Sequence, residues 1–444
     1  MIPISVCVLA FLTTLWVARR SLVQGLLVML AVGYLYGLLR ANIPSPYSHF
    51  IFDSSLAGLY VGQLGVRLST EERRRSSLLR GWIIALIIWP VLVCFLPFQT
   101  FLISMVGLRG NVFFLPLCLF AVRMKREDWF TLALGLASLN ILALGFGGAE
   151  YVLGVEPFYP HSPVTEIIYA SHDVAGYRYF RIPATFTNAH SYAGTMAATL
   201  PLLIGAWTRS GLTAARRAVL TGGLGAAVLG LLMANARVYV VAAAIIAIAT
   251  LLQGGMSKRN RLMCCVGILA AVGIALSNER FQRFTTLTDP SAFTDRIQGS
   301  VNRTFWEILI EYPMGNGLGG GGTSVPSFLA DQVKKPVAME SEYARILLEE
   351  GIIGLTLWGV FMMWVLIGSY AWAPSPWVVA RKLTWCFCLV CFLMASIGTG
   401  LLTNIPMTAL MFLWIGWVMV TPSERNDMAG AQVGLREPQA IYVH

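Results

Sequence analysis

The sequence predicts an all-α, polytopic integral membrane protein. Of its 444 residues, 57% are hydrophobic and only 12% are charged, and the mean hydropathy is +0.68. These values exclude a soluble globular protein, in which about 25% of residues are charged. Apolar stretches of about 20 residues recur along the chain, and each could cross roughly 30 Å of hydrocarbon as a helix. Helices are expected because lipid offers no partners for backbone N–H and C=O groups.

We expect thirteen membrane helices, or twelve if one stretch does not cross. They are predicted at 2–18, 21–39, 50–66, 81–97, 99–122, 129–149, 187–207, 218–236, 238–253, 262–277, 346–370, 383–402 and 404–420. The third and fifth stretches contain Asp53 and Arg109. Charged residues inside an apolar stretch favour a broken or re-entrant helix at both places.

Basic residues set the predicted orientation, because positively charged loops stay in the cytoplasm. Most of the 32 Lys and Arg residues fall in alternate loops, at 19–20, 67–80, 123–126, 209–217, 258–261 and 381–382, and in the tail. The C-terminus is therefore predicted to be cytoplasmic. The first span, with no basic residue before it, is typical of an uncleaved signal anchor. The net charge of +10 follows from this topology, so no nucleic-acid partner is expected.

The predicted organisation has six parts, and two of them are long segments on the outer face. The parts are N-terminal helices (1–149), an outer loop (150–186), middle helices (187–277), a long outer loop (278–345), C-terminal helices (346–420) and a cytoplasmic tail (421–444). We therefore look for function in the two outer loops.

No cofactor, metal or disulfide framework is expected. All eight cysteines fall inside apolar stretches, which favours packing over ligation or disulfide formation. His161, His172, Asp173 and His190 lie in or near the first outer loop, but their spacing matches no pattern of metal ligands.

Arginines at the mouths of predicted helices are the first candidate functional residues. Arg178 and Arg181 precede the helix at 187–207, and a guanidinium offers a planar fork suited to phosphate oxygens. Interfacial snorkelling of the side chains is the alternative. Arg237 interrupts an apolar run two residues after Asn235, so it is expected to face a polar cavity or a counter-ion.

The long outer loop contains an amphipathic segment and a glycine-rich turn. Residues 302–312, which include Arg303 and Trp306, predict a short helix that ends at Pro313. The glycines at 315–322 could cradle phosphate, but no Lys-Ser or Lys-Thr pair follows them, so they are not a P-loop. A flexible surface loop is the alternative.

Acidic residues stand where the long outer loop meets the next helix. Glu340 and Glu342 lie at an apolar boundary, where a carboxylate can be tuned as a general base; capping of the helix is the alternative. Arg345 and Glu349, four residues apart, are expected to pair on the surface of that helix.

Three stretches resemble the O-antigen ligase and polymerase superfamily of bacterial envelope glycosyltransferases. The first stretch, from Arg181 to Asn188 and on to Ala193, is similar to a family motif of Arg, Gly, Phe, Asn-Pro-Asn and Ala, with Ala184 in place of Gly and Ala-His190 in place of Pro-Asn. The second, Asn235-Ala-Arg237, is similar to a Ser-Arg motif.

The third stretch runs through the long outer loop and the helix after it. Arg303-x-x-Trp306 is followed by Pro313 with three alternating glycines, and then by Glu340-Ser341, nine residues and Gly351-Ile-Ile-Gly354. Ligases of this superfamily carry His where Glu340 stands, which favours a polymerase over a ligase. The resemblance covers about residues 175–365.

The resemblance implies a metal-independent glycosyltransferase of the bacterial inner membrane, with its active face in the periplasm. Its donor would be an undecaprenyl-diphosphate-linked oligosaccharide, whose diphosphate Arg181 and Arg237, with Arg178, would hold. Glu340, or else Glu342, would deprotonate the acceptor hydroxyl. Glycan-binding residues would be Asn188, His190, Arg303, Trp306 and Tyr343.

The acceptor distinguishes the functions that remain open. A polymerase would extend another lipid-linked repeat, with a chain-length regulator protein as a further partner besides membrane lipid. A ligase would transfer the glycan to lipid A core or to a protein. A flippase or transporter is less expected, because such proteins often have two repeated halves and the long outer loop occurs once.

Overall fold

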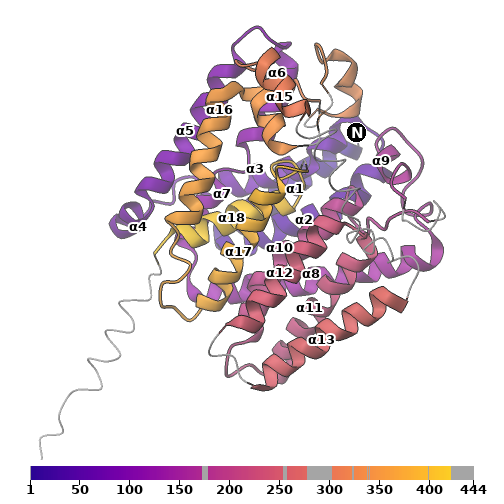
Figure 1. Ribbon diagram of the computed structural model, residues 1–444, viewed down its shortest axis with the longest axis vertical. Helices are drawn as coiled ribbons and strands as arrows, with labels where there is room; N and C mark the ends of the chain where they lie inside the picture. The colour runs from indigo at the N-terminus through magenta and orange to yellow at the C-terminus, as the bar shows by residue number, and fades with distance from the viewer. Residues whose placement is uncertain are drawn as a thin grey trace, which may run out of the picture.

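The computed structural model describes residues 2–172, 179–253, 258–277, 303–322, 325–337, 339, 341–398 and 400–421. Within these residues the chain is helical, with one isolated antiparallel bridge between His172 and Phe180. The predicted all-α fold class is therefore confirmed, and the helices pack side by side around a common core (Figure 1).

Among the described residues, eight helical segments are long and apolar enough to cross a membrane. They are α1 (Ile2–Arg20), α2 (Leu22–Asn42), α5 (Ser77–Cys94), the α6 to η2 segment (Phe101–Arg123), α8 (Arg126–Leu153), α11 (Ala214–Ala234), α13 (Lys258–Ser277) and α16 (Glu342–Ile367). Two shorter apolar helices are α12 (Arg237–Leu252) and α18 (Met407–Met419). The chain is thus a multi-pass membrane protein by the length and composition of its helices.

The remaining predicted stretches are also helical but are shorter or less apolar. They form α3 (Ile51–Gln63), α10 (Ala189–Trp207) and α17 (Val378–Met394). The two stretches that contain Asp53 and Arg109 depart from a straight span. The 13 residues of α3 reach only about 20 Å, and the other stretch breaks into α6 (Phe101–Val112), α7 (Leu117–Phe120) and η2 (Ala121–Arg123).

Short elements connect these helices. They are η1 (Pro46–Phe50), α4 (Thr70–Arg75), α9 (Glu166–Tyr169), α15 (Arg303–Glu311) and η5 (Ser327–Gln332). The predicted helix at 302–312 is confirmed as α15. The predicted helix at 346–370 begins earlier than expected, because the Ser341 hydroxyl caps it and its first turn starts at Glu342.

The predicted basic loops meet at one end of the molecule, which we call the basic end. Arg75 donates a hydrogen bond of 2.9 Å to the Thr421 carbonyl, and Arg381 one of 2.7 Å to the Val420 carbonyl. The Arg209 guanidinium lies 4.7 Å from the Trp377 ring centroid. These contacts join four basic segments that are far apart in sequence, as the predicted alternation requires.

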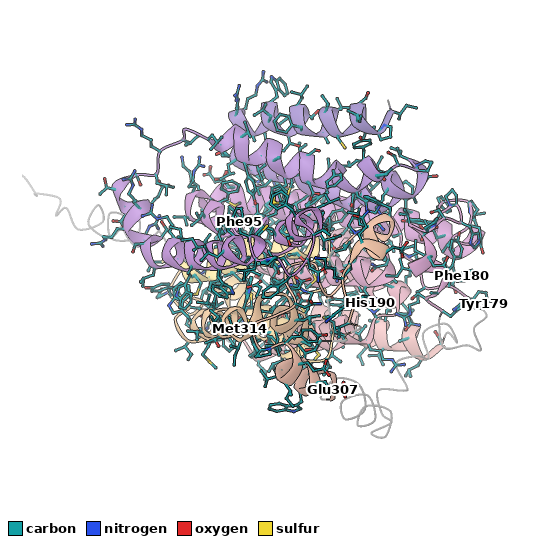
Figure 2. The ribbon with its side chains drawn as sticks, turned by 90° about the horizontal axis from the view of Figure 1, so that it is seen from above. Phe95, Tyr179, Phe180, His190, Glu307 and Met314 are labelled. Atoms are coloured by element: carbon teal, nitrogen blue, oxygen red, sulfur yellow. The ribbon has the colours of Figure 1, made fainter. Side chains whose placement is uncertain are left out.

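The predicted outer segments meet at the other end, which we call the opposite end. Asn42, at the end of α2, donates a hydrogen bond of 2.9 Å to the Phe158 carbonyl. Gln99, which precedes α6, donates one of 2.9 Å to the Asn316 carbonyl in the long outer loop. Figure 2 looks onto residues of these loops, among them Phe95, Met314 and His190.

Helix α10 is central to the core because its small residues let its neighbours approach closely. It packs against α8, α11, α12, α17 and α18, and nearly all of its side chains are buried. A Cβ atom at Gly194 would lie 2.9 Å from both the Met407 sulfur of α18 and the Tyr239 ring of α12, so a side chain there would force those two side chains to move. By contrast, α13 has no buried residue and lies at the edge of the bundle (Figure 1).

Candidate functional site

A buried ionic cluster lies at the start of α16, at the opposite end. Arg345 contacts Glu342 at 2.8 Å and Glu349 at 2.7 Å, and all three side chains have no exposed surface. The predicted pairing of Arg345 with Glu349 is confirmed, but its predicted place on the helix surface is wrong. Tertiary packing covers this face of the helix, and buried charges persist only when they are paired.

Two further segments complete the ionic cluster. Asn111 of α6 accepts a hydrogen bond of 3.0 Å from Arg345 and donates one of 2.9 Å to Glu349. The backbone N–H groups of Gly400 and Leu401 donate to Glu342 at 2.7 and 3.2 Å. The cluster therefore fixes the start of α16 to α6 and to the segment that follows α17.

The glycine-rich turn packs against α16, the helix that carries the ionic cluster, and is not a flexible surface loop. Residues 315–320 are buried. The Asn316 N–H donates to the Leu348 carbonyl at 2.5 Å, and the Ile352 N–H donates to the Pro313 carbonyl at 3.0 Å. The helix makes room for the turn by a kink at Gly351, whose φ is +70°. The turn's glycines therefore serve close backbone packing in this structure.

A chain of polar contacts links the starts of α10 and α12 to the segment after α17. Asn188 caps α10 by accepting a hydrogen bond of 2.8 Å from the Ser191 N–H. The Ser191 hydroxyl lies 3.4 Å from the Asn404 side-chain oxygen, and the Asn404 amide donates to the Tyr239 hydroxyl at 3.4 Å. The Asn404 N–H donates to the Gly400 carbonyl at 3.1 Å, so this chain of contacts adjoins the backbone that binds the Glu342 carboxylate.

Two of the predicted arginines lie at the opposite end, and the third falls outside the described residues. Arg181 is half-buried, and its Nε donates to the His172 carbonyl at 3.1 Å. Arg237 is half-buried and is the first residue of α12, two residues before Tyr239. Arg178 lies outside the described residues. Arg181 therefore lies shortly before α10, and Arg237 begins α12. These are the two helices that the polar contacts join to the segment after α17.

The region between Arg181 and α10 has an unusual backbone. Ala184 is fully buried with φ of +50°, a conformation that glycine adopts without strain. Its N–H donates to Glu150 of α8 at 2.9 Å. Ala184 thus stands, in place of the glycine of the motif that this stretch resembles, at a position where the backbone favours glycine.

The structure describes only one of the two candidate bases. Glu340 falls outside the described residues, between Met339 and Ser341. Glu342 is the first residue of α16, and its buried oxygens accept hydrogen bonds from Arg345, Gly400 and Leu401. Glu342 is not the helix cap, because the Ser341 side chain fills that position by accepting from the Ala344 N–H.

The predicted glycan-binding residues differ in exposure. Trp306 of α15 is 58% exposed, and His190 is exposed at the start of α10. Figure 2 shows His190 on the same face as Glu307, the neighbour of Trp306. Tyr343 is half-buried, and its hydroxyl donates to the Phe392 carbonyl at 2.6 Å, so it anchors α16 to α17. Arg303 is the first residue of α15.

A second, partly buried ion pair lies nearby along α6. Arg109 contacts Asp53 of α3 at 2.7 Å, two residues before Asn111 of the ionic cluster. His49 lies nearby in η1, and its burial, together with the positive charges of Arg40 and Arg109, lowers its pKa to about 4.

Sequence reasoning did not single out Asn111, Asn404 or Tyr239. A polar residue inside an apolar stretch is the signal that could have identified the two asparagines. Among the described residues, no group of three His, Cys, Asp or Glu side chains is placed to hold a metal ion. The chain matches no protein-family model and no curated protein.

Proposed function

We propose that this protein is a membrane glycosyltransferase that joins undecaprenyl-diphosphate-linked oligosaccharide repeats into a surface polysaccharide. In this proposal the opposite end faces the periplasm of a bacterial inner membrane, and the basic end faces the cytoplasm. The proposal rests on the family resemblance of three stretches. It is supported by the way the described parts of those stretches lie around one segment.

The observation that carries the proposal is the position of residues 395–406, of which the structure describes all but Thr399. Ser191 at the start of α10 and Tyr239 at the start of α12 both contact Asn404. Glu342 at the start of α16 accepts from the backbone of Gly400. Two of the three stretches that carry the resemblance therefore contact the same segment, and Tyr239, two residues beyond Asn235-Ala-Arg237, contacts it as well.

The proposed reaction needs a phosphate electrophile and a base. Arg181 and Arg237 bind the diphosphate of the donor and stabilise the charge that develops on it. The acceptor hydroxyl oxygen attacks the anomeric carbon, and the bond from that carbon to the diphosphate oxygen breaks. Undecaprenyl diphosphate leaves with the bonding electrons, and the hydroxyl proton passes to Glu340.

We assign the ionic cluster a positioning role in this reaction. Arg345 occupies one Glu342 oxygen, and the two backbone N–H groups occupy the other. An acceptor hydroxyl could therefore reach neither Glu342 oxygen without displacing one of these donors. Glu340 is therefore the preferred base, and the cluster holds the chain on which Glu340 is carried.

Glycan length distinguishes a polymerase from a ligase. We would complement a deletion strain with wild type, Arg237→Ala, Glu340→Gln or, as a control, Arg74→Ala, whose side chain is 83% exposed at the basic end. For a polymerase, Arg237→Ala and Glu340→Gln reduce the glycan to a single repeat on an intact acceptor, and the Arg74→Ala control keeps long chains. Long chains from both variants, at wild-type protein levels, would refute the proposal.

A ligase is the second candidate, and the same gel identifies it. In a ligase, the two variants remove glycan from the acceptor while long lipid-linked chains accumulate. In a flippase, undecaprenyl-linked repeats would instead remain on the cytoplasmic side, out of reach of a glycosidase added outside the cell.

A further inference from the structure

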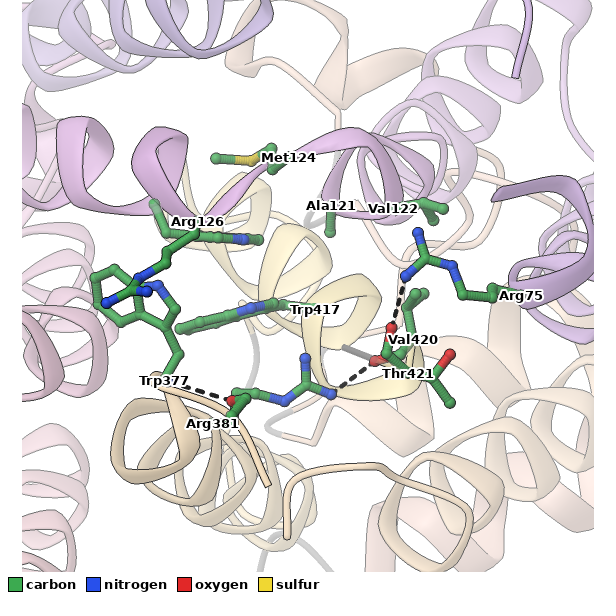
Figure 3. A pocket seen from close by; sticks show the side chains of 12 residues that line it. Arg75, Ala121, Val122, Met124, Arg126, Trp377, Arg381, Trp417, Val420 and Thr421 are labelled. Carbon is green, nitrogen blue, oxygen red and sulfur yellow. Dashed lines mark hydrogen bonds between the residues drawn. The ribbon is translucent and has the colours of Figure 1, made fainter. Parts of the chain in front are cut away.

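A pocket at the basic end combines arginines with tryptophans. Its walls include Arg75 of α4, Arg126 of α8 and Arg381 of α17, together with Trp129, Trp377 and Trp417 (Figure 3). The cavity volume is about 40 Å³, which is room for a few water molecules or a small polar group. None of the twelve described lining residues is acidic.

Part of the arginine charge serves the fold. Arg75 donates to the Thr421 carbonyl at 2.9 Å, and Arg381 donates to the Val420 carbonyl at 2.7 Å, so both hold the end of α18. Arg381 also donates to the Tyr370 carbonyl at 3.2 Å, whereas the Arg75 contact satisfies one of the five N–H groups of that guanidinium. The Arg75 Nε is buried without a hydrogen bond in the described structure, and its nearest carboxylate, Glu71, is 3.9 Å away.

Three tryptophans, each less than 5% exposed, form one wall of the pocket. Trp129 and Trp417 stack with ring centroids 4.2 Å apart, and Trp377 packs against Trp417 at 6.0 Å. Tryptophan is enriched where membrane helices meet the headgroup layer. Basic pockets between helices at the cytoplasmic face suit the headgroups of anionic lipids.

We infer that this pocket binds the phosphate group of an anionic phospholipid. Arg75 and Arg126 contact the phosphate oxygens, and the tryptophan cluster lies beside the glycerol and the first carbons of the chains. The inference is independent of the sugar chemistry proposed for the opposite end. A soluble phosphate would offer the pocket the same chemistry, so the experiment includes both sources.

The test uses the full-length protein, purified in an uncharged detergent, and native mass spectrometry. We would titrate dioleoylphosphatidylglycerol, dioleoylphosphatidylcholine and inorganic phosphate against wild type, Arg126→Gln and Arg74→Gln. Arg126 is exposed, and its side chain makes no hydrogen bond to the part of the chain that the structure describes, so its variant should fold. Arg74 is a matched control from α4 that does not line the pocket.

We expect phosphatidylglycerol to bind more tightly than phosphatidylcholine. Loss of one arginine near a headgroup should weaken phosphatidylglycerol binding about fivefold in Arg126→Gln, with no change in Arg74→Gln. Arginine-dependent binding of inorganic phosphate without the lipid would keep the phosphate site and assign it to a soluble anion. The inference would be overturned if Arg126→Gln and Arg74→Gln bound phosphatidylglycerol with equal affinity and also bound inorganic phosphate with equal affinity.

Discussion

Arg345 donates a hydrogen bond of 2.7 Å to Glu349, one turn further along α16, and neither side chain has any exposed surface. The same guanidinium bonds Glu342 at 2.9 Å on its other side. One cation therefore holds two buried carboxylates. Because each charge depends on the others, removal of a single member should cost more than removal of all three.

Arg345→Met should strongly destabilise the protein. The variant leaves Glu342 and Glu349 buried without their cation, a change that typically costs about 3–5 kcal/mol. We expect a large fall in melting temperature, measured by size-exclusion chromatography after heating in detergent. Adding Glu342→Gln and Glu349→Gln to the same variant should recover much of the loss. A wild-type melting temperature for Arg345→Met alone would contradict the cluster's role.

Gly351→Ala should disrupt the kink in α16. Its φ is +70°, and the new Cβ would lie 2.7 Å from the Met314 carbonyl carbon in the glycine-rich turn. Gly359→Ala is the matched control, because this glycine lies in the same helix with no neighbour within 4 Å of its new Cβ. The control should gain about 0.5–1 kcal/mol of stability. Equal melting temperatures for the two variants would count against the kink.

Ala184→Gly should stabilise the segment before α10. The left-handed conformation costs an alanine about 1–2 kcal/mol, and glycine's greater freedom in the unfolded chain offsets only part of that gain. Ala184→Val should have the opposite effect, because a branched side chain fits neither this conformation nor a fully buried position. Thermal unfolding in detergent tests the pair. A lower melting temperature for Ala184→Gly would show that the methyl contacts outweigh the strain.

Stability should fall as the pH drops from about 6.5 to 4. His49 takes up a proton near pH 6.5 in the unfolded chain but only near pH 4 in the fold, so the unfolded state binds more protons between these values. The contribution is complete above pH 6.5 and amounts to at most about 3 kcal/mol. His49→Gln should flatten the melting temperature over this range, with His161→Gln as the control. An unchanged pH profile in His49→Gln would exclude this histidine as the cause.

The two ends of the molecule should lie on different sides of the membrane. In a variant without native cysteines, a cysteine at position 314 should react with an impermeant maleimide added to intact cells. A cysteine at position 74 should react only after the cells are opened. Met314 is 58% exposed and Arg74 is 83% exposed, so burial would not explain a difference. Labelling of position 74 from outside would reverse the proposed orientation.

Hydropathy and charge along the sequence were sufficient to predict the membrane class, the helical stretches and the separation of basic loops from outer segments. Hydropathy and charge are properties of neighbouring residues, so they can be read along the chain without knowledge of packing. The same local reasoning located the helix at 303–311 and the polar interruptions at Asp53 and Arg109, which coincide with a short helix and a broken one.

Which polar residues contact one another depends on the tertiary structure. Asn111 and Glu349 are 238 residues apart in sequence, and Ser191 and Asn404 are 213 apart. Their contacts depend on which helix faces pack together, and no local pattern carries that information. For the same reason a pair expected on a helix surface is buried, and a turn that was open to a flexible interpretation is packed between α6 and α16.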